Sequence, residues 1–183
     1  MANGFELQFP CAEIPALAER YMQTQGNKDA AAFEAGARIR ARKGQHTEDT
    51  LKDLDVIMRW KSHLGLHHFT SNTPEEIFEA LDFAMNTEQE RTAMGILCGL
   101  DGVAAPMASA ILTALQEPDD ERFTIIDFRA LQALGTKMDS PSVGYYLDYL
   151  DELWKLKVAT GHSLRTIDRA NWQWSVEQSK AAT

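Results

Sequence analysis

Apolar residues recur three and four positions apart along most of this chain, as they do on the buried face of an amphipathic helix. Strand signals are sparse. Asp101-Gly102 is the one Asp-Gly pair, and helical patterns flank it on both sides. We therefore predict an all-α fold. The expected helices cover residues 12–25, 28–43, 47–61, 74–85, 87–98, 104–116, 125–135, 143–160 and 164–179.

Several of these expected helices begin with a capping signal. Thr73 precedes Pro74 and two acidic residues, a typical first turn. Residues 87–90 read TEQE, which is the pattern of a capping box. Ser140-Pro141 separates the preceding segment from a helix rich in aromatic residues.

The composition is typical of a globular intracellular protein. Its 183 residues are 44% hydrophobic, enough for one domain built of two packed lobes spanning 1–183. The net charge of −9 excludes a uniformly basic coat for nucleic acid but leaves room for a local basic patch. Cys11 and Cys98 form no disulfide framework or zinc knuckle. No signal peptide or apolar run of about 18 residues is present, so we expect a cytoplasmic protein without membrane contact.

Residues 87–116 are the most informative segment. One helical pattern ends near Cys98, a short loop follows, and a second helix begins with Pro106 in its first turn. Gly102 in the loop can adopt positive φ and allows another backbone to approach. The amides at the start of the second helix would suit a phosphate without any lysine or arginine. The alternative is a plain αα-hairpin with a glycine turn.

Residues 100–112, LDGVAAPMASAIL, resemble the hairpin of the helix-hairpin-helix DNA glycosylase superfamily, whose usual form is L-P-G-V-G-x-x-x-A. Leu100, Gly102, Val103 and Ala108 match this form. Aspartate replaces the usual proline at 101, and alanine replaces the second glycine at 104.

Three further segments are similar to a small stand-alone branch of the same superfamily. They read RWKS at 59–62, FTIIDFRALQALG at 123–135 and RTIDRANWQWS at 165–175, so the resemblance covers about residues 55–178. It implies an all-α enzyme that binds double-stranded DNA, flips a base out of the stack and acts as a monomer. The hairpin residues implied to contact DNA are Leu100, Gly102, Val103, Ala104 and Ala105.

The resemblance also implies a catalytic carboxylate downstream of the hairpin, and Asp127 is our candidate. A carboxylate beside the sugar would stabilise an oxocarbenium-like transition state and orient water, as in glycoside hydrolysis. Asp127 is also expected to cap the following helix. A gapless alignment from the hairpin places Thr124 at the family position, so Asp127 requires a three-residue insertion in the acidic connection.

Lyase-competent members of the superfamily carry a lysine where this chain has Pro106. The resemblance therefore implies a monofunctional DNA glycosylase without lyase activity. Its substrate would be a damaged or modified base, with a modified phage base, and hence phage defence, as one option. We expect no cofactor beyond a monovalent cation held by hairpin carbonyls, and no metal, because His63 and His67 lack accompanying carboxylates.

Basic and aromatic side chains complete the predicted interface. Four cations are candidates for DNA contact: Lys61, Arg129, Arg165 and Arg169. Three aromatics are candidates for the base pocket, with core packing as the alternative for each: Trp60, Tyr145 and Trp172. Asp168 is better explained by an ion pair or a helix start than by catalysis. Residues 38–43 either join the basic patch or form a solvated helix face paired with acids.

Two other functions remain compatible with the sequence. A non-catalytic module could keep the hairpin for DNA binding and lack the chemistry. A helical interaction protein could contain a glycine turn that only mimics the motif.

Overall fold

The computed structural model describes residues 4–64, 66–137 and 140–181, and no β-strand occurs among them. The predicted all-α class is confirmed. The chain divides into two compact units. We call Lys28–Phe123 the hairpin unit, and Met1–Asn27 together with Thr124–Thr183 the terminal unit. No helix in the described part of the chain is long and apolar enough to cross a membrane.

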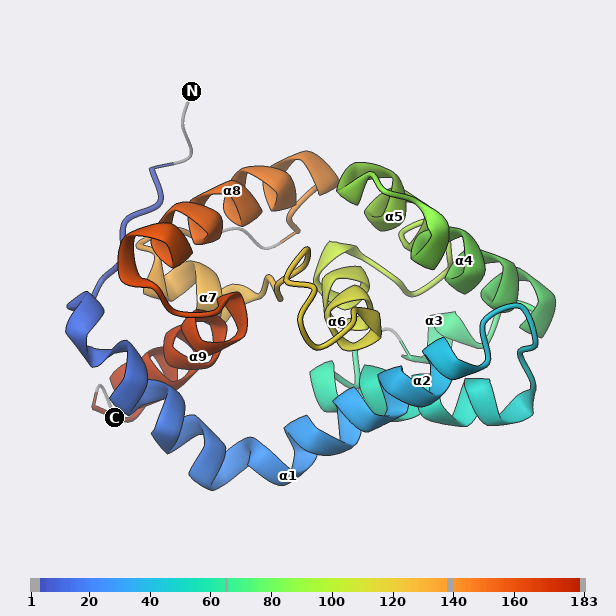
Figure 1. Cartoon of the computed structure of the whole chain (residues 1–183), viewed down its shortest axis with the longest axis horizontal. Coiled ribbons are helices and arrows are strands. Elements are labelled where there is room, and N and C mark those ends of the chain that lie inside the picture. Colours follow the sequence, from blue (N-terminus) through green and yellow to red (C-terminus); the bar gives the residue numbers. More distant parts are fainter. Residues whose placement is uncertain (1–3, 65, 138–139, 182–183) are drawn as a thin grey trace. The chain divides into compact units, whose positions relative to one another are not determined.

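The hairpin unit is organised around helix α6 (Ala105–Leu115). Every residue of α6 except Pro106 is buried, because α2, α4 and α5 all pack on it (Figure 1). The unit also contains the second half of α1 and the short helix α3. The bounds are α1 Ile14–Ala41, α2 Glu48–Lys61, α3 Leu66–Phe69, α4 Pro74–Asn86 and α5 Glu90–Leu97.

A close approach to α1 also restricts α6. A Cβ atom added to Gly36 would lie 2.0 Å from the carbonyl oxygen of Ala114. Only glycine allows the two backbones to approach this closely. The helix that follows the hairpin turn is therefore fixed at its C-terminal end by backbone contact.

The terminal unit contains the short 3-10 helix η1 (Cys11–Glu13), the first half of α1, and α7 (Phe128–Ala133), α8 (Val143–Thr160) and α9 (Leu164–Ala181). Helices α7 and α8 both pack on α9. Tyr146 and Tyr149 of α8 are fully buried. The extended N-terminal segment is bound to the end of α7, because the amides of Glu6 and Gln8 donate to the carbonyls of Leu134 and Ala133.

Three predicted boundaries are wrong. The segments 12–25 and 28–43 form one continuous helix, α1, which runs through Gly26. A glycine inside a helix costs about 1 kcal/mol, and the buried side chains on both sides of Gly26, such as Tyr21 and Ala32, offset that cost. Helix α3 was not predicted.

The other two errors concern helix starts. Helix α5 begins at Glu90 instead of 87, because Thr87 closes α4 by donating its amide to Phe83. Helix α7 begins at Phe128 instead of 125, since the preceding residues are buried in an extended segment. The capping signal at Thr73 is confirmed: its hydroxyl accepts from the amide of Glu76, whose carboxylate accepts from Thr73 in return.

Candidate functional site

The hairpin turn connects α5 to α6 within the hairpin unit. Backbone hydrogen bonds from Leu100 to Leu97 (3.1 Å) and from Val103 to Leu100 (3.2 Å) tighten it. The side chains of Leu100 and Val103 are buried and anchor the turn. Gly102 has a φ of +78°, a conformation that side-chain-bearing residues rarely adopt. The glycine is therefore a requirement of this turn.

The turn leaves backbone donors without protein acceptors. Among the described residues, no acceptor takes the amide hydrogens of Gly102, Ala104 or Ala105. These amides adjoin the N-terminus of α6, where the helix dipole favours negative charge. Ala104 has φ −91° and ψ 171°, an ordinary extended conformation. Alanine therefore fits where the motif usually has its second glycine.

Asn72 holds this turn from a distant loop, and sequence analysis missed it. Its side-chain oxygen accepts from the amide of Asp101 at 2.9 Å, and its side-chain nitrogen donates to the Asp101 carbonyl at 3.0 Å. The same nitrogen donates to the carbonyl of Phe69 at 2.8 Å. Asn72 thus fixes Asp101, the residue before Gly102, through both its amide and its carbonyl. No local pattern signals this contact, because 29 residues separate the two positions.

Asp127 lies in the terminal unit and caps α7 as predicted. Its Oδ1 accepts from the amides of Arg129 at 3.0 Å and Ala130 at 2.9 Å. The residue is half-buried. These two bonds set the orientation of the carboxylate.

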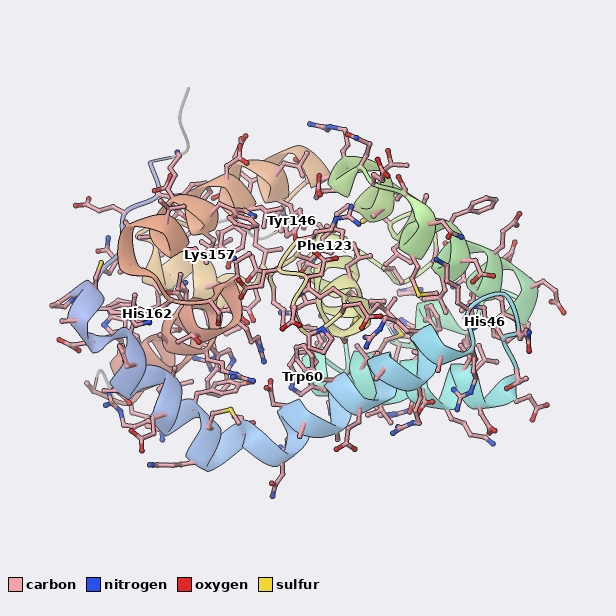
Figure 2. The ribbon with its side chains drawn as sticks, viewed as in Figure 1. His46, Trp60, Phe123, Tyr146, Lys157 and His162 are labelled. Carbon is pink, nitrogen blue, oxygen red and sulfur yellow. The ribbon has the colours of Figure 1, made fainter. Side chains whose placement is uncertain are left out.

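Buried tyrosines of α8 hold the extended segment that leads to Asp127. The Tyr149 hydroxyl donates to the Ile125 carbonyl at 2.8 Å, and the Tyr146 hydroxyl donates to the Thr124 carbonyl at 3.1 Å. Figure 2 labels Tyr146. Burial raises the pKa of Tyr149 well above its usual range, and the nearby charges of Asp168 and Asp127 raise it further. The phenol therefore stays protonated and keeps its bond to the backbone.

The two competing positions for the carboxylate have different surroundings. Thr124 is 1% exposed and carries no ionisable group. Asp168 is 5% exposed and forms an ion pair with Arg165, one turn earlier on α9. This geometry agrees with the ion-pair interpretation of Asp168. Of the three positions, Asp127 combines a negative charge with partial exposure.

Cations and aromatic rings gather beside Asp127. The guanidinium of Arg129 lies 4.8 Å from the ring centre of Phe128 and 5.3 Å from that of Trp172. Trp172 meets the ring of Tyr21 edge to face at 5.2 Å, and Arg165 lies over the other ring of this pair, Tyr21, at 5.6 Å. The structure thus brings together three predicted site residues of the terminal unit: Arg129, Arg165 and Trp172.

Four other predicted site residues have the following surroundings. Arg169 is half-buried on α9, the helix that also carries Arg165 and Trp172. Tyr145 packs edge to face on Phe5 and donates to the Thr136 hydroxyl at 3.3 Å, which is a packing role. Trp60, labelled in Figure 2, packs on Phe33 at the end of α2 in the hairpin unit. Lys61 is the last residue of α2.

Arginines 38, 40 and 42 are engaged within the hairpin unit. Arg38 and Arg42 both donate to the carboxylate of Asp53. Arg40 donates to the carbonyls of Leu115 and Gln116 at the end of α6. A pocket of about 210 Å³ opens nearby, lined by residues that include Arg40, Lys43 and Arg122. These arginines serve as links between helices, so the segment 38–43 agrees with the paired-helix alternative.

Metal ligands do not gather in the described part of the chain: no group of three or more His, Cys, Asp or Glu side chains there could hold a metal ion. His63 and His67 are both exposed.

The chain was also compared with known proteins. No protein-family model matches it, and neither a curated protein nor a solved structure gives a significant match.

Proposed function

We propose that this protein is a monofunctional DNA glycosylase that hydrolyses the bond between a damaged or modified base and its deoxyribose in double-stranded DNA. The observation that carries the proposal is the hairpin turn, in which three amides that have no acceptor in the described part of the chain adjoin the N-terminus of a buried helix. Such amides bind a phosphate through the backbone, so they need no basic residue in a chain of net charge −9.

Asp127 supplies the chemistry in this proposal. Removing a flipped base develops positive charge on the sugar, which a fixed carboxylate stabilises. The cap bonds to Arg129 and Ala130 hold Asp127 in one orientation, and its partial exposure leaves room for water and substrate. Arg129, Arg165 and Arg169 would contact phosphates of the same DNA.

Water, instead of an amine, is the proposed nucleophile. Pro106 stands in the first turn of α6 and carries no amine. Excision therefore stops at the abasic site, and no covalent adduct between protein and DNA forms. The cofactor requirement is limited to a monovalent cation at the carbonyls of the hairpin, and the enzyme acts as a monomer in the cytoplasm.

The experiment is incubation of the protein with duplexes that each contain one modified base, followed by alkali, which cleaves DNA at abasic sites. The set includes oxidised, alkylated, deaminated and mispaired bases and the modified bases of phage DNA. Alkali-dependent cleavage of one duplex supports the proposal. A covalent adduct trapped by borohydride would contradict the water mechanism and direct attention to Lys61 or Lys137.

The non-catalytic alternative gives a different result. It predicts DNA binding that falls steeply with salt, without cleavage of any duplex. A helical interaction protein would show neither cleavage nor salt-dependent binding. The set of duplexes and a salt titration together separate the three functions.

A further inference from the structure

Phe128 is an exposed aromatic residue next to the candidate carboxylate. It is the first residue of α7, directly after Asp127, and 66% of its surface is exposed. A large apolar side chain this exposed gains little from burial, so packing within the fold does not explain it. The aromatics predicted for the base pocket from the sequence were Trp60, Tyr145 and Trp172, and Phe128 was not among them.

The surroundings of Phe128 hold it in place. Arg129 sits against both the Phe128 ring and the Trp172 ring, at 4.8 and 5.3 Å from their centres. The same guanidinium donates to the Ser175 hydroxyl at 3.4 Å, and Ser175 donates to Gln132 at 2.7 Å. The aromatic and cationic side chains are therefore ordered before any ligand arrives.

We infer that Phe128 forms the stacking surface for the flipped nucleobase, with Arg129 as the cation behind it. The inference rests on the proposed function and deepens it by naming a binding residue. A nucleobase is planar and presents a π-face, which stacks on an aromatic side chain whatever the base. A guanidinium held against the ring adds a cation–π contribution. Phe128 follows Asp127 directly, so the inference places the sugar of the stacked base beside that carboxylate.

The test compares two exposed phenylalanines. Phe128→Ala removes the proposed stacking ring. Phe83→Ala is the matched control, because Phe83 is 56% exposed on α4 of the hairpin unit. Loss of one stacked base lowers affinity by about fivefold to a hundredfold. We expect that loss, together with a lower kcat/KM for excision, in Phe128→Ala and no change in Phe83→Ala.

Two further variants separate stacking from apolar contact. Phe128→Trp keeps a π-face and is expected to retain affinity, whereas Phe128→Leu keeps apolar area without a ring and is expected to lose it. The fluorescence of 2-aminopurine at the target position reports the contact directly. A flipped 2-aminopurine stacked on Phe128 is quenched in the wild type and bright in Phe128→Leu.

The outcomes distinguish this inference from the function on which it rests. If the wild type cleaves a duplex, but Phe128→Ala behaves like Phe83→Ala, the stacking role is wrong and the function stands. The stacking role is also wrong if Phe128→Leu and Phe128→Trp retain DNA affinity equally well. If the wild type cleaves no duplex, the proposed function fails, and the inference fails with it.

Discussion

The hairpin turn of the hairpin unit and the start of α7 in the terminal unit present opposite kinds of chemistry. The hairpin turn offers main-chain amides around Gly102, and its conformation does not depend on a charged side chain. The second offers the side chains of Asp127, Phe128 and Arg129. A main-chain site depends little on which side chains surround it, whereas a side-chain site depends on each residue.

Both segments depend on a hydrogen bond from far along the chain. Asn72 bonds the peptide unit of Asp101 across 29 residues, and Tyr149 bonds the carbonyl of Ile125 across 24 residues. Each supporting side chain bonds to backbone atoms. The two segments can therefore be compared by removing either the proposed functional group or its support.

The largest expected effect is on catalysis by Asp127→Asn. Asparagine keeps the cap on α7, so the free energy of unfolding should change by less than about 1 kcal/mol. Loss of the charge should lower the excision rate about a hundredfold or more. Rates on the cleaved duplex and urea unfolding measure the two effects.

Asp168→Asn and Thr124→Ala are the controls for this result. Both residues are buried, and we expect their effects to track stability instead of the chemical step. Full excision by Asp127→Asn, with inactive Asp168→Asn or Thr124→Ala, would reassign the carboxylate.

Removing the support of the terminal unit should cost stability. Tyr149→Phe leaves the buried Ile125 carbonyl without its bond from the hydroxyl, at a cost of about 1–3 kcal/mol in the free energy of unfolding. Tyr145→Phe is the matched control, because its hydroxyl bonds Thr136 on a half-buried side chain. Equal urea-unfolding midpoints for the two variants would show that the Tyr149 hydroxyl does not hold the extended segment before Asp127.

Gly102→Val should weaken DNA binding about tenfold, because valine resists positive φ at a cost of about 1–2 kcal/mol. Gly44→Val is the control, since Gly44 has φ +73° with open space around its Cα. Both variants carry the same backbone strain, and only the first lies in the hairpin. Affinity from a salt titration should fall in Gly102→Val alone; a parallel fall in both would trace the effect to stability.

The support of the hairpin should give a smaller change. Asn72→Ala removes the bonds to the Asp101 peptide unit and should weaken DNA binding by about threefold to tenfold, since each bond contributes about 1 kcal/mol. Hydrogen exchange at the Asp101 amide should accelerate. Asn86→Ala, an exposed residue at the end of α4, should change neither. An unchanged exchange rate at the Asp101 amide would show that Asn72 does not hold the hairpin turn.

The smallest expected effect is a difference in acid sensitivity. Burial opposes ionisation of Asp53, but hydrogen bonds from Arg38 and Arg42 outweigh it and lower the pKa of that carboxyl below 3.8. The ion pair therefore stabilises the hairpin unit fully above pH 3.8, and this contribution is lost as pH falls through the lowered pKa. Asp53→Asn should unfold with a weaker dependence on pH in that acidic window. If the pH dependence of unfolding is the same in Asp53→Asn as in the wild type, other groups cause the acid sensitivity.

Features encoded by neighbouring residues were predictable from the sequence. The all-α class, the Thr73 cap, the turn at Gly102 and the cap by Asp127 all depend on spacing within a few positions. The continuity of α1 was not predictable, because tertiary burial overrides the weak helix propensity of Gly26 and Asn27.

The surroundings of the candidate site were predictable only in part. Arg129 and Trp172 were candidates, but their contact with each other and with Phe128 joins α7 to α9 across more than forty residues of chain. The roles of Asn72 and Tyr149 depend equally on distant partners. Local pattern identifies the residues that carry charge or permit a turn, whereas the residues that hold them in place emerge from packing.

The discontinuous terminal unit has a consequence for synthesis on the ribosome. The hairpin unit is a single stretch of chain, so it is complete as soon as Phe123 has left the exit tunnel. The first half of α1 must wait, because Arg20 pairs with Glu177, 157 residues later, and Tyr21 packs on Trp172. Domains generally fold as units during translation. The nascent protein therefore completes its hairpin turn first, and the terminal unit closes around its own N-terminal segment only after α9 has been made.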